Sequence, residues 1–553
     1  MPQQQNLRDD QDDDEEEEQV RERDLVEAYV AEHSLESSLN DVINQVVANR
    51  PEDPFLMLSS LLYARATAKR GIFYVQVCEV LDALGEPTVL VRLHTGKGIF
   101  EGFCSAEAGG IKDCECSTRG LGDESNDAGV GFSHVPPSKQ RYGGRGYTKI
   151  AAIAQRLLVE KLVGLEPTEQ GALDDILQSL ESTVGRNVSL AASLAICQAG
   201  AKYAEMPLRE HVARLQELPP ENLCVPMPLF SIVNGGKYAS NKLFAQEILL
   251  TPTSATSFAD ALQIGVEFNT VLHTQLEARG IGFTNRGAFG GFAPQFQTLD
   301  EVFRVLRAAL DDVRARLEDP EGNAISTVSA SPLRVEFGVD FAASEFAVHP
   351  VRTDTDAASQ NEGEEEDMRR SSTYNMDQWV SGSGGSIKTG DEFFNIVRSS
   401  VKELEVTTVV DPFDTDDIKS FSALCSAEND NDSDAPPTGD PADTGGSAEN
   451  GPLAKGGASL GGDPNCQFPT VSRLLQAITN AQHLGFAVIL GASAGQPGSD
   501  AAILTALAMG AGVGQVKFGG LVGAECLDRY RSLLLASEEP GAPPFVGASA
   551  YRR

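Results

Sequence analysis

The chain has 553 residues and a formal net charge of −36, from 44 basic and 80 acidic side chains. Such an acidic surface repels phosphate backbones and anionic lipid, so we expect neither nucleic acid nor a membrane as a partner. The 9 cysteines are scattered without paired spacing, which is typical of a reducing compartment. The first residues do not have the pattern of a signal peptide, and no apolar run is long enough to span a bilayer. The sequence therefore predicts a cytoplasmic protein of two or three domains.

Residues 1–21 form an acidic tail that contains the run DDQDDDEEEE. This composition has too little apolar surface to bury, so we expect the tail to be disordered.

A short helical hairpin is predicted over residues 22–68. Its first helix carries an apolar stripe at spacings of three and four residues, and its second follows RPEDP, with Asp53 placed to cap it. Two helices this short cannot enclose their own stripes, so association into a four-helix bundle would bury them. The positions that define this predicted surface are Leu39, Ile43, Val46, Pro51, Pro54, Phe55, Leu58 and Leu62.

The stretch RPEDP and the apolar helix after it resemble the dimerisation and docking motif shared by Dpy-type proteins and kinase regulatory subunits. The resemblance implies a homodimer that binds an amphipathic helix of an anchoring protein, often in cilia or flagella. The alternative is a plain helical cap that packs on the main domain.

From residue 71 the pattern changes to that of a larger α/β protein. Residues 71–220 hold short β-rich runs followed by helices, an α+β domain. Over residues 225–540, strand-like runs alternate with amphipathic helices, which favours parallel βα units in a barrel. Polar stretches at 348–373 and 426–465 interrupt this pattern and predict disorder. The strand-like runs are PMPLFSIV, AQEILLTP, RVEFGVDFA, EVTTVVDPF, FAVILGAS and GQVKFGG.

Six stretches in this region are similar, and in the same order, to enolase, the glycolytic lyase that interconverts 2-phosphoglycerate and phosphoenolpyruvate. The resemblance implies an α/β fold with an enolase-type (β/α)8 barrel and an N-terminal α+β capping domain. It also implies dimerisation through the main domain and Mg²⁺ as the cofactor of active members. The stretches are GEPTV (85–89), NGGKYASNKLFAQE (234–247), GGFAPQFQT (290–298), VDFAASEF (339–346), DPFDTDD (411–417) and GQVKFGG (514–520).

Some of the family's site residues have counterparts here. By the resemblance, Glu247 matches one of two acid-site glutamates, and Asp340 matches the first of three metal carboxylates. Lys517 matches the lysine that holds the substrate carboxylate, and Gln246 lies where the substrate is contacted. The alternative is that these residues are inherited without remaining use.

Other counterparts are missing. Where the family has a DEGG turn, this chain has AFGG, with Phe289 in place of the second acid-site glutamate. The family's strand end EDP is VDP here, so Val410 replaces a metal carboxylate. Tyr238 stands where the family has a substrate-side histidine. The phosphate-binding SHRSG reads GASAG at 491–495, without a cation.

The mobile serine loop and the base lysine are also replaced. Ala108 stands at the serine, and a less firmly anchored alignment puts Pro464 at the base lysine. The two strands that would carry this lysine and the third metal carboxylate cannot be found, so the barrel is predicted to be incomplete.

Loss of a single general acid or base costs roughly 10²–10⁴ in rate, so several losses together predict that ordinary turnover is absent. The sequence therefore favours a dimeric, enolase-like scaffold, placed in a cilium or flagellum by analogy, which could also pair with an active enolase. One alternative is a working Mg²⁺-dependent phosphopyruvate hydratase tethered by the same hairpin. Another is a remnant site that binds an anion through Lys237 and Lys517 without turnover.

Overall fold

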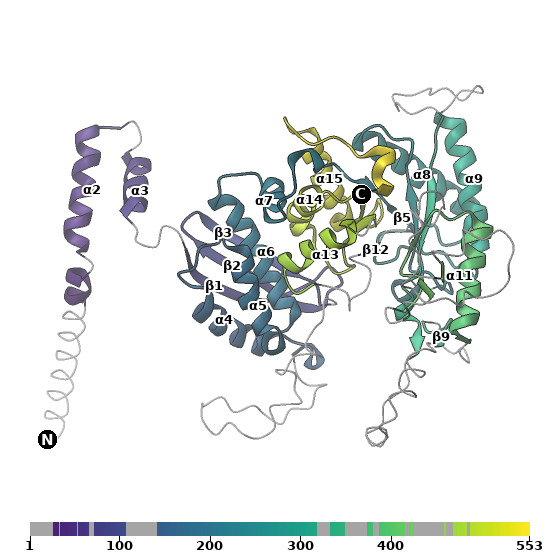
Figure 1. Ribbon diagram of the computed structural model, residues 1–553, viewed down its shortest axis with the longest axis horizontal. Coiled ribbons are helices and arrows are strands. Elements are labelled where there is room, and N and C mark those ends of the chain that lie inside the picture. The colour runs from purple at the N-terminus through teal and green to yellow at the C-terminus, as the bar shows by residue number, and fades with distance from the viewer. Residues whose placement is uncertain are drawn as a thin grey trace, which may run out of the picture.

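The computed structural model describes the hairpin, the α+β domain and most of the barrel (Figure 1). The acidic tail lies outside the described residues, as do the two polar stretches apart from positions 348, 373 and 458–459. The described residues are 26–32, 34–51, 54–65, 71–106, 141–239, 241–317, 332–348, 373–379, 386–414, 417, 420–421, 423–424, 458–459, 468–483 and 487–552.

The hairpin consists of α2 (Leu35–Asn49) and α3 (Pro54–Arg65), which pack against each other. Helix α2 ends where Arg50 takes a left-handed conformation, with φ of 45°, and donates its N–H to the Val46 carbonyl. Proline is the first residue of α3, a position where its fixed φ and missing N–H cost nothing. Both predicted helices are confirmed, whereas the predicted cap at Asp53 lies outside the described residues.

The α+β domain begins with an antiparallel sheet in the order β1-β2-β3. Helices α4 and α6 pack on this sheet (Figure 1). A Cβ atom on Gly102 of β3 would lie 1.9 Å from the Ala191 carbonyl oxygen of α6, so only glycine permits this close approach. The elements are β1 (Ile72–Leu81), β2 (Pro87–Thr95), β3 (Gly98–Cys104), a 3₁₀ turn (Arg141–Gly144), α4 (Thr148–Leu162), α5 (Gln170–Val184), α6 (Arg186–Tyr203) and α7 (Leu208–Leu215).

The barrel strands form two four-stranded sheets, β11-β7-β6-β5 and β12-β13-β14-β4. Strands β4 and β5 are consecutive in the chain. The N–H groups of Leu229 and Ser231 donate to the carbonyls of Val516 and Gly519, so the pairing of β4 with β14 continues into β5. The two sheets are therefore continuous with each other. The strands are β4 (Met227–Pro228), β5 (Phe230–Asn234), β6 (Glu247–Thr251), β7 (Glu336–Asp340), β11 (Thr408–Val410), β12 (Ala458–Ser459), β13 (Val488–Gly491) and β14 (Gln515–Lys517).

Strand β6 departs from the parallel βα pattern of the barrel, because it pairs antiparallel with both β5 and β7. The connection from β5 to β6 holds only the short turn Gly236–Tyr238, whereas a parallel crossover needs a helix-sized connection. Two helices separate β6 from β7. Each helix runs the length of the barrel once, so the two together bring the chain back to the end at which β6 finished, and β7 then runs antiparallel to β6.

Strand β12 lies within the polar stretch at 426–465, for which the sequence predicts disorder. Its residues, 458 and 459, pair in parallel with β13, which gives their backbone groups hydrogen-bond partners. A short strand thus exists in the stretch where two strands could not be placed from the sequence.

Helices on the outside of the barrel cover its strands and share its largest apolar core. Helix α11 begins with a capping box formed by Thr389 and Glu392. None of the helices in the described ranges is long and apolar enough to cross a membrane. The remaining elements are α8 (Phe258–Arg279), α9 (Leu299–Leu317), β8 (Ala347–Val348), β9 (Thr373–Asn375), β10 (Ile387–Thr389), α11 (Gly390–Leu404), α13 (Val471–His483), α14 (Ala501–Gly510), α15 (Ala524–Glu538) and 3₁₀ turns at Pro220–Asn222, Ala343–Glu345, Gly498–Asp500 and Gly547–Arg552.

Candidate functional site

Three strand ends bring Glu247, Asp340 and Lys517 together inside the barrel. Glu247 begins β6 and Asp340 ends β7, where the two are cross-strand partners, and Lys517 ends β14. Each side chain is at most 1% exposed. The Lys517 Nζ lies 2.9 Å from Asp340 Oδ2 and donates a hydrogen bond to Glu247 Oε1. We call these three residues the buried triad.

The buried triad places one ammonium group between two carboxylates. Burial by itself lowers the pKa of Lys517, but the Asp340 and Glu247 carboxylates more than offset this and raise it well above its ordinary value. Lys517 is therefore protonated at neutral pH and has no lone pair with which to take a proton from a substrate.

An apolar cluster adjoins the buried triad in the barrel interior. Val410 is fully buried and is the β11 partner of Asp340. It packs with Leu229, Leu249 and Ile489. Strand β11 therefore supplies a hydrocarbon side chain, and no oxygen ligand, beside Asp340.

An aromatic ring lies over the ammonium group of the buried triad. The Phe289 ring centroid lies 5.2 Å from Lys517 Nζ, and Phe289 makes an edge contact with Tyr238 at a centroid distance of 5.6 Å. The negative face of an aromatic ring stabilises a nearby cation, so Phe289 favours an ammonium at this point.

A second lysine lies next to Tyr238. The Lys237 Nζ is 5.2 Å from the Tyr238 ring centroid, 6.0 Å from that of Trp379 and 3.2 Å from Glu345 Oε1. This lysine therefore also contacts a carboxylate.

Two family models match the chain. One, described as "Enolase, N-terminal domain", matches residues 72–212, and the other, "Enolase, C-terminal TIM barrel domain", matches residues 222–435. The enolase of Eimeria tenella is 30% identical over 368 residues, which cover 64% of this chain and 71% of that protein. The chain belongs to the enolase family.

Two plant relatives support the same assignment. Cytosolic enolase 3 of Arabidopsis thaliana is 28% identical over 408 residues, 72% of this chain and 74% of that protein. The enolase of Solanum lycopersicum is 26% identical over 500 residues, which cover 87% of this chain and 98% of that protein. The predicted enolase fold is thus confirmed, and the hairpin precedes the residues that the family models match.

Active enolases use Mg²⁺, but the buried triad does not fit this ion. Mg²⁺ requires an octahedral set of oxygen ligands, usually with several waters. Here Asp340 and Glu247 already contact an ammonium, and their neighbours Val410 and Phe289 carry no donor atom. Within the described part of the chain, no group of three or more His, Cys, Asp or Glu side chains is arranged to hold a metal.

The loop at 491–495, which the sequence analysis compared with the enolase phosphate-binding loop, contacts the α+β domain. In the loop at 491–495, the Ser493 hydroxyl lies 2.8 Å from that of Ser105, and the Gly495 carbonyl accepts a hydrogen bond from the Ala83 N–H. Four of the five residues in this loop are Gly or Ala, so it offers no charge to a phosphate. Ala108 and Pro464 lie outside the described residues.

Gln246 is buried beside the triad, and its backbone N–H donates to the Asp340 carbonyl. The alternative in which Lys237 and Lys517 together bind an anion is not favoured, because each ammonium already contacts a carboxylate.

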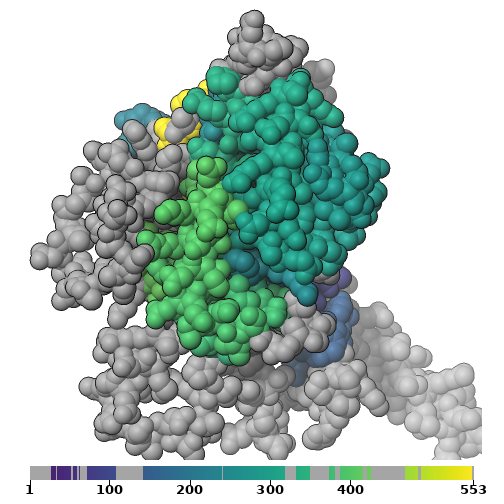
Figure 2. All heavy atoms as spheres, turned by 90° about the vertical axis from the view of Figure 1, so that its right-hand side faces the viewer, coloured from purple at the N-terminus to yellow at the C-terminus, as the bar shows by residue number. Residues whose placement is uncertain are grey.

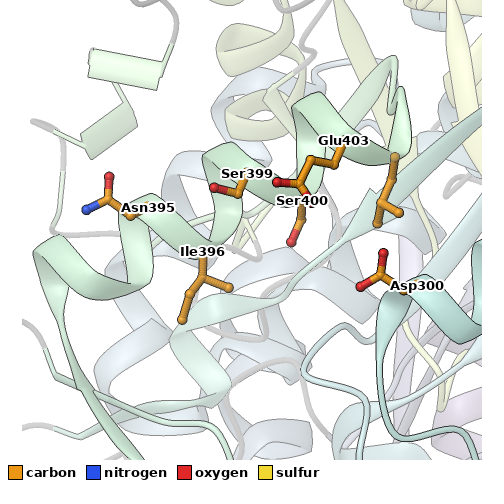
Figure 3. Close-up of a pocket in the computed structure, with 7 residues that line it drawn as sticks. Asp300, Asn395, Ile396, Ser399, Ser400 and Glu403 are labelled. Carbon is orange, nitrogen blue, oxygen red and sulfur yellow. The ribbon is translucent and has the colours of Figure 1, made fainter. Parts of the chain in front are cut away.

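A separate surface pocket of about 330 Å³ lies between α9 and α11. Figure 2 shows this side of the molecule, where α9 in teal and α11 in green adjoin. Asp300 of α9 and Ser399, Ser400 and Glu403 of α11 line the pocket (Figure 3). It shares no residue with the buried triad.

The hairpin positions named from the sequence have different environments. Val46 is buried, and Pro51, Leu58 and Leu62 are half-buried. By contrast, Leu39, Ile43, Pro54 and Phe55 are exposed, Phe55 to 81%.

Sequence reasoning missed the surroundings of these lysines. Glu345 lies inside the enolase-like stretch VDFAASEF, and Trp379 is the only tryptophan of the chain, yet neither was singled out. An acidic residue within a matching stretch and a unique tryptophan were the available signals. Their contact with Lys237 depends on the folding of the β8–β10 region and was not visible locally.

Proposed function

We propose that this enolase-family protein does not catalyse ordinary 2-phosphoglycerate dehydration and instead serves as a dimeric scaffold or anchored component. The observation that supports the first half most directly is Lys517, whose ammonium lies between the Glu247 and Asp340 carboxylates. These are the groups that matched an acid-site glutamate, a metal ligand and a substrate-binding lysine. Because the Glu247, Asp340 and Lys517 side chains contact one another, none of them is suited to the role that it matched.

The second half rests on the hairpin. Leu35, Leu39, Ile43 and Val47 follow one another at intervals of four residues along α2 and are 36%, 44%, 47% and 65% exposed. We call these four residues the α2 stripe. Such a continuous apolar row on one helix is typical of an interaction surface.

A second copy of the hairpin is the proposed first occupant of the α2 stripe, and an amphipathic helix of an anchoring protein is the proposed second partner. By analogy with dimerisation and docking motifs, we propose a ciliary or flagellar location. Pairing of the main domain with an active enolase is compatible with this role.

Turnover of 2-phosphoglycerate by the purified full chain in Mg²⁺ tests the catalytic half, with an active enolase as the positive control. We expect no phosphoenolpyruvate above the no-enzyme blank. A rate within about a hundredfold of the control, less than the loss of one good acid or base can cost, would contradict the proposal and favour a tethered phosphopyruvate hydratase. Sedimentation velocity tests the associating half, because a chain that stays monomeric at every concentration contradicts it.

A further inference from the structure

The pocket between α9 and α11 is lined by five polar side chains that are free to bind a ligand. Each helix contributes a carboxylate, and α11 adds two hydroxyls and a carboxamide. Across the described part of the chain, no hydrogen bond or ion pair involves any of these five side chains. They are Asp300, Asn395, Ser399, Ser400 and Glu403.

The more deeply placed residues of this pocket are mainly apolar. Leu404 is 6% exposed and Ile396 is half-buried, whereas Asp300 and Glu403 are exposed at the rim. In Figure 3, Asp300 of α9 lies across from Ser400 and Glu403 of α11. A ligand with a hydrocarbon chain and a charged end fits this division, because the chain can cover the apolar residues while the charge stays at the rim.

The electrostatics of the pocket favour a cation. Asp300 and Glu403 bring two negative charges, and Glu403 lies in the last turn of α11, where the helix carbonyls carry partial negative charge. The chain already places one cation at this helix end, because Arg307 of α9 donates to the Leu404 carbonyl at 3.2 Å. An anionic ligand would be repelled here.

We propose that this pocket binds a small aliphatic amine, such as a linear diamine, whose ammonium groups contact Asp300 and Glu403 and whose hydrocarbon chain covers Ile396 and Leu404. The serine hydroxyls and the Asn395 carboxamide oxygen accept the remaining N–H donors. A volume of about 330 Å³ is at the lower end for ligand sites and suits a molecule of this size. A divalent metal is less well matched, because Mg²⁺ takes oxygen ligands only and gains nothing from the apolar residues.

The pocket shares no residue with the buried triad or the hairpin, so this inference goes beyond the proposed function. Turnover of 2-phosphoglycerate and the state of association test that function and leave the amine site untouched.

Equilibrium dialysis of the full chain against radiolabelled putrescine, a linear diamine, tests the proposal. We expect one saturable site per chain, with binding that weakens as NaCl is raised, because salt screens exposed charges. Asp300→Asn with Glu403→Gln should weaken binding roughly fivefold to thirtyfold, the combined effect of two exposed ion pairs. The matched control is Asp311→Asn with Asp391→Asn, which removes one exposed carboxylate from each of the same helices outside the pocket and should bind like the wild type.

Competition identifies the chemistry that the pocket selects. Butylamine has a single ammonium, so it should displace putrescine only at a several-fold higher concentration than unlabelled putrescine. Butanediol, an uncharged analogue of the same length, should not displace it. Mg²⁺ should also need a higher concentration than unlabelled putrescine.

The absence of a saturable site in the wild type would overturn the proposal. Equal losses in D300N/E403Q and D311N/D391N would do the same, because the diamine would then be spread over the acidic surface. Displacement by butanediol, or by Mg²⁺ at a lower concentration than putrescine, would assign the pocket to a different ligand. Circular dichroism checks that D300N/E403Q is folded, and Ser399→Lys is the second variant, since a positive charge at the exposed rim should abolish the site. Unchanged binding in S399K would contradict the proposal even if D300N/E403Q does not fold.

Discussion

At the scale of single residues, Asp500 is a buried carboxylate whose protonation is linked to stability. It is 6% exposed and accepts a hydrogen bond from the Gln496 side chain. Burial raises the pKa of Asp500 from its ordinary 3.8 to about 7, although the hydrogen bond and the nearby Arg529 guanidinium lower it. The protonated form is thus favoured by folding, because ionisation leaves a charge with little solvation.

Asp500→Asn should therefore change how stability depends on pH. The folded pKa lies above the unfolded one, so the contribution of Asp500 is complete below about pH 4 and is lost as pH rises through about 7. The free energy of unfolding of the wild type should fall relative to that of D500N over this interval, by at most about 1.4 kcal/mol per pH unit. Chemical denaturation of both proteins between about pH 5 and about pH 8 measures the difference. A difference that does not vary with pH would show that Asp500 stays ionised in the folded protein.

At the scale of elements, the start of α13 is held by the α+β domain. The Ser472 N–H donates to Asp174 Oδ2 at 2.9 Å, and the Val471 N–H donates to the Ser193 hydroxyl at 2.9 Å. The Ser193 hydroxyl in turn donates to Asp174 Oδ1 at 2.6 Å. Side chains of α5 and α6 thus satisfy backbone donors that a helix leaves free at its N-terminus. This cap joins the domain to the barrel directly after the long polar stretch at 426–465.

Asp174→Ala should loosen this junction. We expect a loss of about 1–3 kcal/mol in the free energy of unfolding, because buried N–H and hydroxyl groups lose their acceptor. Hydrogen exchange at the first amides of α13 should become faster. The matched control is Asp175→Ala, an exposed aspartate on the same helix, which should alter neither quantity. Equal effects in both variants would mean that Asp174 does not act through α13.

At the scale of the whole molecule, association must overcome charge. Each copy carries a net charge of −36, so two copies repel each other at low ionic strength. The α2 stripe offers an apolar surface that can offset this repulsion when a second hairpin covers it. Salt screens the repulsion and leaves apolar contact intact, so association should strengthen as NaCl is raised.

The double variant Leu39→Glu with Ile43→Glu should be monomeric where the wild type is dimeric, because it puts two charges into the α2 stripe. The matched control, Asn44→Glu with Ala48→Glu, adds the same charges at the same four-residue spacing to exposed positions outside the stripe. Sedimentation velocity at several protein concentrations measures the outcome, and circular dichroism checks that α2 stays helical. A dimer that persists in L39E/I43E would move the interface to the main domain.

The sequence by itself determined the types of element and the identity of three site residues. Strands such as β7 and β14 and the apolar positions of α9 follow local patterns of hydrophobicity, which each segment carries in its own residues. Glu247, Asp340 and Lys517 were found because each lies within a stretch that resembles the family. Only the tertiary structure decided what these residues contact. Lys517 was expected to face a substrate, yet it contacts both carboxylates, because the closing of β14 beside β4 and β5 brings the end of β14 to the ends of β6 and β7. The antiparallel course of β6, the short strand β12 and the cap of α13 likewise depend on partners distant in the chain, which no local pattern encodes.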